Sequence, residues 1–231
     1  VHSLKDVPTQ PAMGLYKAAV LKRGAYTDTL VAKNGTEFLN DGHVKSVIAT
    51  SSTRRRAQFL HRYPHHTITN LRGNVNTRLQ KVKDNEWHGA IFATAGLERT
   101  GLKPADAIEL DWMLPAPGQG AVVCVCNEDD KVSRDACARL NDTDTDICTS
   151  IERDFLRTLM GGCSVPIAAL ARITDRVVDF KGNILSPDGI QKEEVAMQLP
   201  VHDCKNMGIE AAHRILKSET GSAIVQSLRN A

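Results

Sequence analysis

Strand signals and helix-start signals alternate between residues 47 and 99, and this alternation constrains the fold more than any other feature. The short apolar runs that favour β-structure are 47–49, 67–69 and 89–93. The helix starts that follow them are the hydroxyl run 50–52, the Arg72-Gly73-Asn74 turn and the segment after Gly96. Helices placed between strands in this way predict a parallel α/β unit.

Arginine dominates the stretch from Thr50 to Leu79 inside this unit. Six arginines and no acidic residue occur in it, although the whole chain has a net charge of only +2. A surface of one charge sign attracts ligands of the other sign, and arginine binds carboxylates and phosphates bidentately. Ligands of parallel α/β sheets bind beyond the carboxyl ends of the strands, at helix N-termini. The arginines at or just after those ends, which we expect to converge on one crevice, are Arg54, Arg55, Arg72 and Arg99.

Two other interpretations of the arginines have to be weighed. Single charged residues are mostly solvated surface residues, so any one of these arginines has that alternative. Nucleic acid is the other anion to consider. Against it, aromatic residues make up only 4% of the chain, which is too few for a stacking platform, and the chain has no basic tail or recognised nucleic-acid motif.

Composition indicates a folded protein of a reducing compartment. The chain has 231 residues and 42% hydrophobic residues, enough for real cores. It contains no apolar run near the ~20 residues that a membrane span needs and no signal peptide. The six cysteines form neither a secreted disulfide framework nor a zinc-binding pattern, so we expect a cytoplasmic protein without a metal site. Cys124 and Cys126 alternate in an apolar strand, and we expect their thiols to be buried.

Two connections suggest that one domain is inserted in another. A strand is expected at 15–21, the segment 23–26 is a candidate crossover, and a polar connection covers 101–113. The second connection, Leu114-Pro115-Ala116-Pro117-Gly118-Gln119-Gly120, leads into a nearly all-apolar strand at 121–126 that should be central in its sheet. We therefore expect a hinge between two α/β lobes. The first is built from 1–23 and 119–140 and the second from 24–118.

The character of the chain changes after Leu140. We expect residues 141–231 to form a small α+β domain with a mostly antiparallel sheet. The expected helices are 150–160, 204–217 and 219–229, the expected strands lie near 167–173, 176–180 and 193–199, and the expected turns are 181–183 and 187–189. The two glycines of Gly161-Gly162-Cys163 allow a sharp bend, which should place Cys163 on an exposed loop.

The first residues carry one more chemical feature. The segment 1–8 resembles the end of a strand that runs into a loop, and we expect further residues upstream of Val1. Lys5-Asp6 before Pro8 is consistent with an ordinary polar turn. A carboxylate at a strand end can instead hold N–H donors or stabilise a developing cation.

Taken together, these segments resemble the porphobilinogen deaminase (hydroxymethylbilane synthase) family. The motifs that carry the resemblance, in the family's order, are HSLKDVP at 2–8, TSSTRRRAQ at 50–58, LRGNVNTRL at 71–79, AGLERTGL at 95–102, LPAPGQGAV at 114–122 and GGCSVPI at 161–167. The resemblance implies two lobes like those of periplasmic binding proteins, the first incomplete here because the family's N-terminal segment is absent, and a third domain with a cofactor-bearing cysteine.

The resemblance also implies a reaction. Enzymes of this family are transferases of tetrapyrrole (haem) biosynthesis. They join four porphobilinogen molecules head to tail, release ammonia at each step, and finally release hydroxymethylbilane. The growing chain carries an acetate and a propionate on each pyrrole, which suits an arginine-lined crevice. The implied partners are this small-molecule substrate alone, with no nucleic acid and no membrane, and the implied state is a monomer.

Residue by residue, the resemblance assigns the following roles. The implied catalytic residues are Asp6 and its neighbour Lys5. The implied cofactor-binding residues are Cys163, which carries a covalent dipyrromethane, with Ser51, Ser52, Arg54, Arg55, Arg72 and Gly73. The implied substrate-binding residues are Arg78 and Arg99. The alternative from another class is a non-catalytic two-lobed anion receptor, which would need neither Asp6 nor the Gly-Gly-Cys loop. A nucleic-acid binder, with strongly salt-dependent binding, is the third option.

Overall fold

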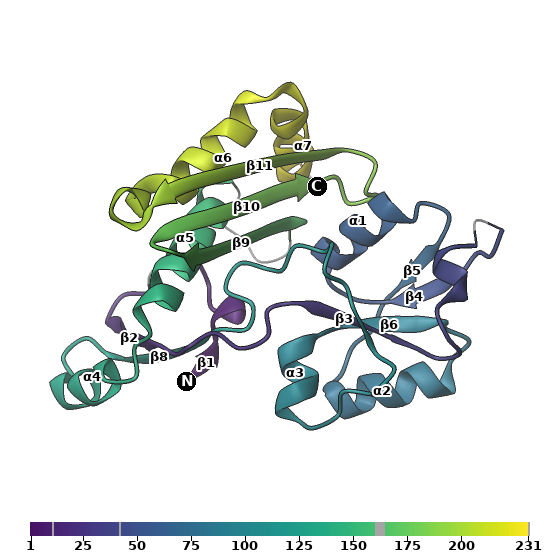
Figure 1. The fold of residues 1–231 in the computed structure, drawn as a ribbon, viewed down its shortest axis with the longest axis horizontal. Coiled ribbons are helices and arrows are strands. Elements are labelled where there is room, and N and C mark those ends of the chain that lie inside the picture. The colour runs from purple at the N-terminus through teal and green to yellow at the C-terminus, as the bar shows by residue number, and fades with distance from the viewer. Residues whose placement is uncertain (11, 42, 160–164, 231) are drawn as a thin grey trace.

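The computed structural model describes residues 1–231 except 11, 42, 160–164 and 231, and the described residues form three β-sheets with helices around them (Figure 1). The first sheet has the order β1-β8-β2 and is antiparallel. Its strands are β1 (His2–Ser3), β8 (Val122–Asn127) and β2 (Leu15–Val20). The expectation that the apolar segment after residue 120 is a central strand is confirmed. A single 3₁₀ turn, η1 (Leu4–Asp6), follows β1 directly.

The second sheet is mixed rather than parallel. Its order is β5-β4-β6-β3-β7. Its strands are β5 (Thr67–Thr69), β4 (Val47–Ala49), β6 (Gly89–Ala93), β3 (Asp28–Ala32) and β7 (Ile108–Glu109). Strand β4 is parallel to both β5 and β6, as expected, but β3 is antiparallel to β6 and to β7. The prediction of a parallel unit for residues 47–99 is therefore confirmed. Strands β3 and β7, which lie outside that stretch, make the complete sheet mixed.

Helices cover both faces of this second sheet. They are α1 (Thr53–Arg62), α2 (Val75–Asp84) and α3 (Thr94–Arg99), with a 3₁₀ turn η2 (Glu37–Leu39). Ser52 and Asn74 cap α1 and α2 by accepting backbone N–H bonds, as the hydroxyl run and the Gly-Asn turn predict. One core, around Ile48, Phe59 and Ile91, lies on one face, and a second, around Leu71, Val82 and Phe92, lies on the other.

The third sheet is an antiparallel meander of the order β9-β10-β11. Its strands are β9 (Ile167–Thr174), β10 (Val177–Leu185) and β11 (Lys192–Pro200). The helices packed with it are α5 (Thr143–Leu159), α6 (Met207–Lys217) and α7 (Glu219–Arg229), and a 3₁₀ segment η3 (Val201–Asn206) connects β11 to α6. Helix α4 (Lys131–Ala138) packs instead against β2 and β8. One core of aliphatic and aromatic side chains fills the space between this sheet and its helices.

Two expectations for this part of the chain are wrong in detail. The turn expected at 181–183 lies inside β10, because Gly182 is a packing glycine: a Cβ added there would lie 2.7 Å from Cζ of Phe155. The hairpin of β9 and β10 turns at Asp175 and Arg176, whose φ angles are +50° and +61°. The helix expected at 150–160 begins earlier, at Thr143, because Asp142 accepts a hydrogen bond from the backbone N–H of Thr145.

The two connections between the first and second sheets run side by side. The backbone N–H of Gly24 donates to the carbonyl of Gly120 at 3.0 Å. A Cβ on Gly120 would lie 2.7 Å from the carbonyl oxygen of Ala25, so only glycine allows this approach. Arg23 in the first connection forms an ion pair with buried Glu152 of α5, with Nη1 and Oε1 2.6 Å apart, which ties the third sheet to the same junction. None of the helices in the described ranges has the length and apolar character of a membrane crossing.

Candidate active site

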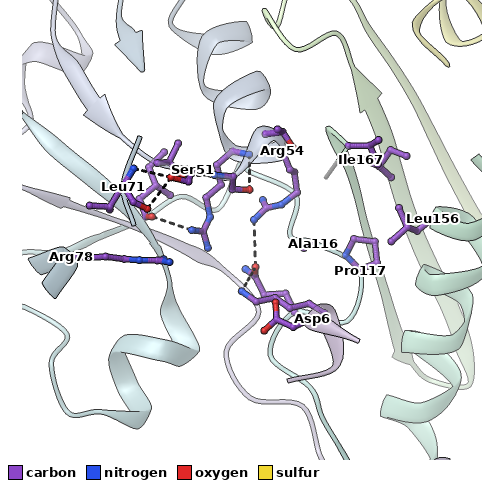
Figure 2. A pocket seen from close by; sticks show the side chains of 17 residues that line it. Asp6, Ser51, Arg54, Leu71, Arg78, Ala116, Pro117, Leu156 and Ile167 are labelled. Atoms are coloured by element: carbon purple, nitrogen blue, oxygen red, sulfur yellow. Dashed lines mark hydrogen bonds between the residues drawn. The ribbon is translucent and has the colours of Figure 1, made fainter. Parts of the chain in front are cut away.

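A cavity of about 470 Å³ lies where the three sheets meet. Figure 2 shows that its walls come from the start of α1, from η1, from the second connection and from the third sheet with α5. The residues that line it are Lys5, Asp6, Thr50, Ser51, Ser52, Thr53, Arg54, Arg55, Leu71, Arg78, Ile91, Ala116, Pro117, Gln119, Leu156, Val165 and Ile167. The arrangement joins residues that are more than a hundred positions apart in the sequence.

The start of α1 supplies the largest share of the polar wall. Strand β4 ends at Ala49, and the chain turns into α1 at Thr53, so the segment between them lies at the carboxyl edge of the sheet. The Ser51 hydroxyl donates to the carbonyl of Leu71 and accepts from its backbone N–H, both at 2.9 Å. Ser51 therefore fixes the loop after β5 against the loop after β4, while Ser52 caps the helix.

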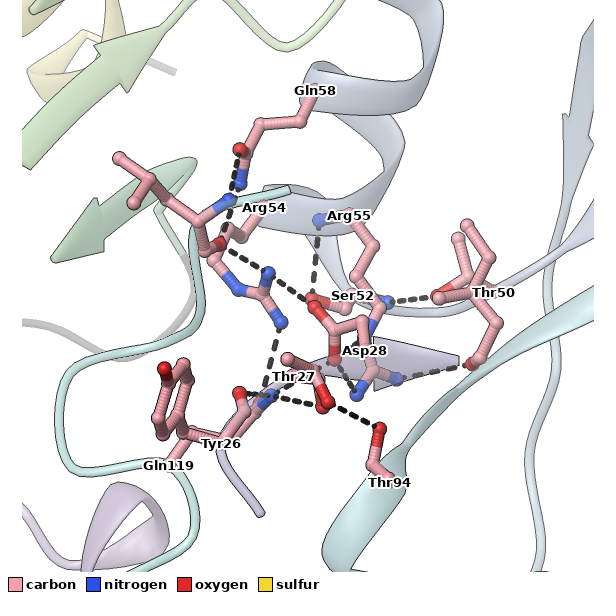
Figure 3. A network of polar contacts seen from close by, with 12 residues as sticks. Tyr26, Thr27, Asp28, Thr50, Ser52, Arg54, Arg55, Gln58, Thr94 and Gln119 are labelled. Atoms are coloured by element: carbon pink, nitrogen blue, oxygen red, sulfur yellow. Dashed lines mark hydrogen bonds and ion pairs between the residues drawn. The ribbon is translucent and has the colours of Figure 1, made fainter. Parts of the chain in front are cut away.

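Arg54 and Arg55 are buried and are held by one carboxylate, Asp28 at the start of β3 (Figure 3). Nη1 of Arg54 donates to Oδ2 of Asp28 at 2.7 Å, and Nε and Nη2 of Arg55 donate to Oδ1 at 3.0 and 2.8 Å. Burial alone would raise the pKa of Asp28, but attraction to the two guanidinium groups outweighs it and holds that pKa well below its usual range. Asp28 stays ionised, and it neutralises one of the two arginine charges.

Lys5 and Asp6 face the cavity from η1. The segment that carries them is fixed by Arg153 of α5, whose guanidinium donates to the carbonyls of Leu4, Val7 and Pro8. Lys5 is half-buried, and burial together with repulsion from Arg55 lowers the pKa of its ammonium group to about 8. Asp6 is exposed, and it is the single carboxylate among the described lining residues.

Arg78 reaches the cavity from α2 (Figure 2). Its Nε donates to the carbonyl of Gly73 at 2.7 Å, while the described residues offer its two terminal nitrogens no hydrogen bond. Burial lowers the pKa of Arg78, and the charge of Arg55 lowers it further. Arg78 thus presents a guanidinium fork that is oriented at one end and available at the other.

The structure does not bring all of the expected residues together. Arg72, Gly73 and Arg99 are exposed and are not among the described residues that line the cavity, so the expected convergence of the arginines holds for Arg54 and Arg55, joined by Arg78. Cys163 lies outside the described residues. On either side of the segment that contains it, Leu156 and Val165 line the cavity.

Two buried residues of the site were missed by the sequence reasoning. Asp28 opens the run Asp28-Thr-Leu-Val-Ala, where an acidic residue before an apolar strand was the only local signal. Gln119 belongs to a motif that was singled out, but nothing in its neighbours marks the side chain as buried. Its amide nitrogen donates to Oδ1 of Asp28 at 2.9 Å. With Asp28 included, the cavity has four cationic side chains, Lys5, Arg54, Arg55 and Arg78, against two carboxylates.

In sequence, the chain is similar to porphobilinogen deaminases. The family model described as "Porphobilinogen deaminase, dipyromethane cofactor binding domain" matches residues 1–135, and "Porphobilinogen deaminase, C-terminal domain" matches residues 147–217. A porphobilinogen deaminase of Macrococcus caseolyticus is 40% identical over 84% of this chain and 64% of its own length. Those of Geobacillus kaustophilus and Staphylococcus epidermidis are 39% and 37% identical over 99% and 100% of this chain. The chain covers 74% and 75% of those two relatives.

Among solved structures, one from a study of glutathione import in Gram-positive bacteria, with a cystine importer of Streptococcus mutans, aligns with 52% of this chain and 54% of its own. Its TM-score is 0.31 and its identity 14%, which is too low to show a shared fold.

Proposed function

The chain belongs to the porphobilinogen deaminase family, and on that premise we propose that its cavity binds a dipyrromethane cofactor and joins porphobilinogen units to it with loss of ammonia. Enzymes of this family, also called hydroxymethylbilane synthases, are transferases of tetrapyrrole biosynthesis. The observation that carries the proposal is the composition of the cavity, in which four cationic side chains surround the single lining carboxylate, Asp6.

The residues present fit the cofactor. A dipyrromethane bears carboxylate side chains, and the cavity offers it cationic groups, the N-terminus of α1 and apolar side chains from the third sheet. The apolar residues Leu156, Val165 and Ile167 form the wall nearest in sequence to Cys163. We propose that Cys163 carries the cofactor through a thioether. When bound, the cofactor supplies the anchored pyrroles to which the substrate units are joined.

The cationic side chains of the cavity would bind carboxylates in two different ways. The terminal nitrogens of Arg78 have no hydrogen bond from the described residues, so Arg78 is the best placed for a bidentate carboxylate contact. Arg54 and Arg55 share Asp28 and contribute mainly positive potential, with Ser51, Ser52 and the first N–H groups of α1 beside them. Arg72, Gly73 and Arg99, which are exposed, are proposed to contact carboxylates of the cofactor or substrate beyond the cavity described here.

Asp6 is proposed to act on the reacting pyrroles. Loss of ammonia from porphobilinogen leaves an electron-deficient, azafulvene-like cation, and a fixed carboxylate beside the pyrrole N–H groups lowers the barrier to its formation. Lys5 stands next to Asp6 with a pKa of about 8, so near neutral pH it is mostly an ammonium group that can bind a substrate carboxylate.

Other parts of the proposal concern the whole protein. We propose a monomeric, cytoplasmic enzyme. We further propose that the first two sheets, in residues 1–23 with 119–140 and in 24–118, are lobes like those of periplasmic binding proteins, and that 141–231 form the cofactor-bearing domain. Separate hydrophobic cores in the three parts support this division.

Intact mass of the purified holoenzyme tests the proposal against the anion-receptor alternative. The wild-type protein should carry one dipyrromethane adduct, Cys163→Ala should carry none, and Cys124→Ala should retain it. Cys124 is the matched control because it is a buried strand thiol of the first sheet. A wild-type protein without the adduct that still binds small carboxylates would be a receptor, and an adduct retained in Cys163→Ala would move the attachment site elsewhere.

A further inference from the structure

Gln119 lies at the junction of the two connections, and its side chain is fully buried. It stands between Gly118 and Gly120, whose φ angles of +75° and +84° favour glycine. The backbone carbonyl of Gln119 accepts from Nε of Arg23 at 2.9 Å, and its backbone N–H donates to Ala116 at 2.9 Å. The backbone is therefore held on both sides, and the direction of the side chain is fixed with it.

The amide of Gln119 contacts both sides of the cavity. Figure 3 shows its contacts on the side of Asp28 and Arg54. Its nitrogen donates to the carbonyls of Tyr26 and Thr27 at 2.8 and 3.2 Å and to Oδ1 of Asp28 at 2.9 Å. Its oxygen accepts from Nζ of Lys5 at 3.5 Å and from Nη2 of Arg54 at 3.4 Å. Acceptors surround the nitrogen and cationic donors face the oxygen, so only one orientation of the amide satisfies both sets.

The distances show that the nitrogen and the oxygen of the amide have different roles. The bonds from the nitrogen include short ones and attach Gln119 to the start of β3, in the second sheet. The bonds to the oxygen are long, and they reach Lys5 of η1, which follows the first strand of the first sheet, and Arg54 of α1. One buried oxygen is therefore a shared acceptor for a cation from each side of the cavity.

We propose that Gln119 is a positioning residue for the condensation reaction: its amide aligns Lys5, and with it the neighbouring Asp6, with the Asp28–Arg54–Arg55 cluster on the opposite wall. The inference rests on the proposed function, because it names the residue that holds the two walls of the same cavity in their relative positions. Gln119 does not itself need to contact the substrate. Its effect on turnover passes through Lys5, Asp6 and Arg54.

Gln119→Met tests the proposal, because it keeps the volume of the side chain and removes both ends of the amide. Gln58→Met is the matched control. Gln58 is also a buried glutamine, and its amide exchanges two 2.9 Å hydrogen bonds with the backbone of Leu114 in the same connection. Among the described residues, its amide is hydrogen-bonded to neither Lys5 nor Asp28. Both changes remove a buried amide that is bonded within the same connection, so a difference between the folded variants in Lys5 reactivity or turnover reports on alignment.

The first measurement is the rate at which acetic anhydride acylates Lys5, followed by peptide mass across a pH series. Only the neutral amine reacts, so the wild-type rate should rise with a midpoint near the pKa of about 8. Loss of the acceptor oxygen disfavours the ammonium form, and Lys5 in Gln119→Met should react roughly threefold faster at pH 7. Gln58→Met should follow the wild-type curve.

The second measurement is steady-state ammonia release by the active holoenzyme as a function of porphobilinogen concentration, which gives kcat and KM separately. Misaligned walls should lower kcat about tenfold or more in Gln119→Met, with KM for porphobilinogen changed by less than about threefold. Gln119→Asn, which keeps an amide but cannot reach both walls, should shift both measurements in the same direction by smaller amounts. It decides the question if Gln119→Met does not fold.

The proposal is overturned if the folded Gln119 variants acylate and turn over like Gln58→Met. The two measurements also separate this inference from the proposed function. A wild-type holoenzyme that releases no ammonia would contradict the proposed function. In that case the comparison of Lys5 reactivity between Gln119→Met and Gln58→Met would still decide whether Gln119 positions Lys5.

Discussion

Asp6 faces the cavity as its single described carboxylate, so its charge rather than its shape should matter. Asp6→Asn keeps the size and removes the charge, and losing one well-placed electrostatic group costs ~10²–10³ in kcat. Asp6→Glu keeps a displaced charge and should be slow but measurable. The check is single-turnover kinetics on the holoenzyme, with the enzyme-bound oligopyrroles followed by mass. Chain elongation at the wild-type rate in Asp6→Asn would contradict the catalytic role of Asp6 and leave it as an ordinary turn residue.

Asp28 should be far more important for stability than its single charge suggests. Asp28→Asn leaves two buried guanidinium groups with one carboxylate fewer, and breaking a buried pair typically costs ~3–5 kcal/mol. Urea unfolding at pH 7 measures this loss. Asp154→Asn, which breaks a partly exposed bridge to Arg157, is the control and should change stability by less than about 1 kcal/mol.

The same residue sets the direction of an acid effect. The folded-state pKa of Asp28 is depressed, so its contribution is complete above the unfolded pKa of about 4 and is lost as pH falls through the folded value. The stability difference between wild type and Asp28→Asn should therefore shrink below about pH 4. A difference that stays constant down to pH 2 would mean that Asp28 is not held ionised by its arginines.

The residues of the site differ in how far the sequence alone reveals them. Arg54 and Arg55 can be recognised from the sequence because their residue type, the clustering of arginines around them and their position after a strand all indicate an anion site. Their partner Asp28 precedes them by 26 positions or more, and no local pattern links the two. Burial of charge is a property of the assembled fold, so the sequence indicates an anion site here but not that two of its cations are already paired.

At the scale of elements, Gly182 shows how packing overrides a local turn signal. Gly182→Ala would place its Cβ 2.7 Å from Cζ of Phe155 and 3.1 Å from Cε1 of Phe180, and such overpacking should cost ~1–3 kcal/mol. The double variant with Phe155→Leu should recover part of the loss in thermal unfolding. Gly96→Ala, where the nearest atom is 4.0 Å away inside α3, should be neutral or stabilising. Equal effects of the two alanines would contradict this account.

Helices and caps of the second sheet follow from sequence more closely than its strand directions. The starts of α1 and α2 carry their own capping residues, Ser52 and Asn74, so local chemistry specifies them. Strand β3 pairs antiparallel with β6, which comes more than 55 positions later. The partner of a strand depends on the topology of the whole sheet. The positions of the helices were therefore predictable from local sequence, whereas the mixed strand directions were not.

At the scale of the whole molecule, one buried ion pair joins the parts around the cavity. Glu152 of α5 accepts from Arg23, from the backbone N–H of Gly118 at 2.7 Å and from that of Ala171 at 2.8 Å. It thereby links the two connections, the third sheet and the segment next to Gln119. The cavity lies between parts with separate cores, and its geometry depends on this small junction.

The nesting of the second sheet inside the first has a consequence for the order of synthesis. Strand β8 separates β1 from β2, yet it follows them by about a hundred residues. A nascent chain that has emerged as far as Glu109 contains every described strand of the five-stranded sheet, whereas strand β8 between β1 and β2 is still to come. The inserted unit can thus fold on the ribosome first. The host sheet closes only when residues 122–127 emerge and bring Gly24 and Gly120 together. The cavity is completed later still, when Leu156, Val165 and Ile167 have followed.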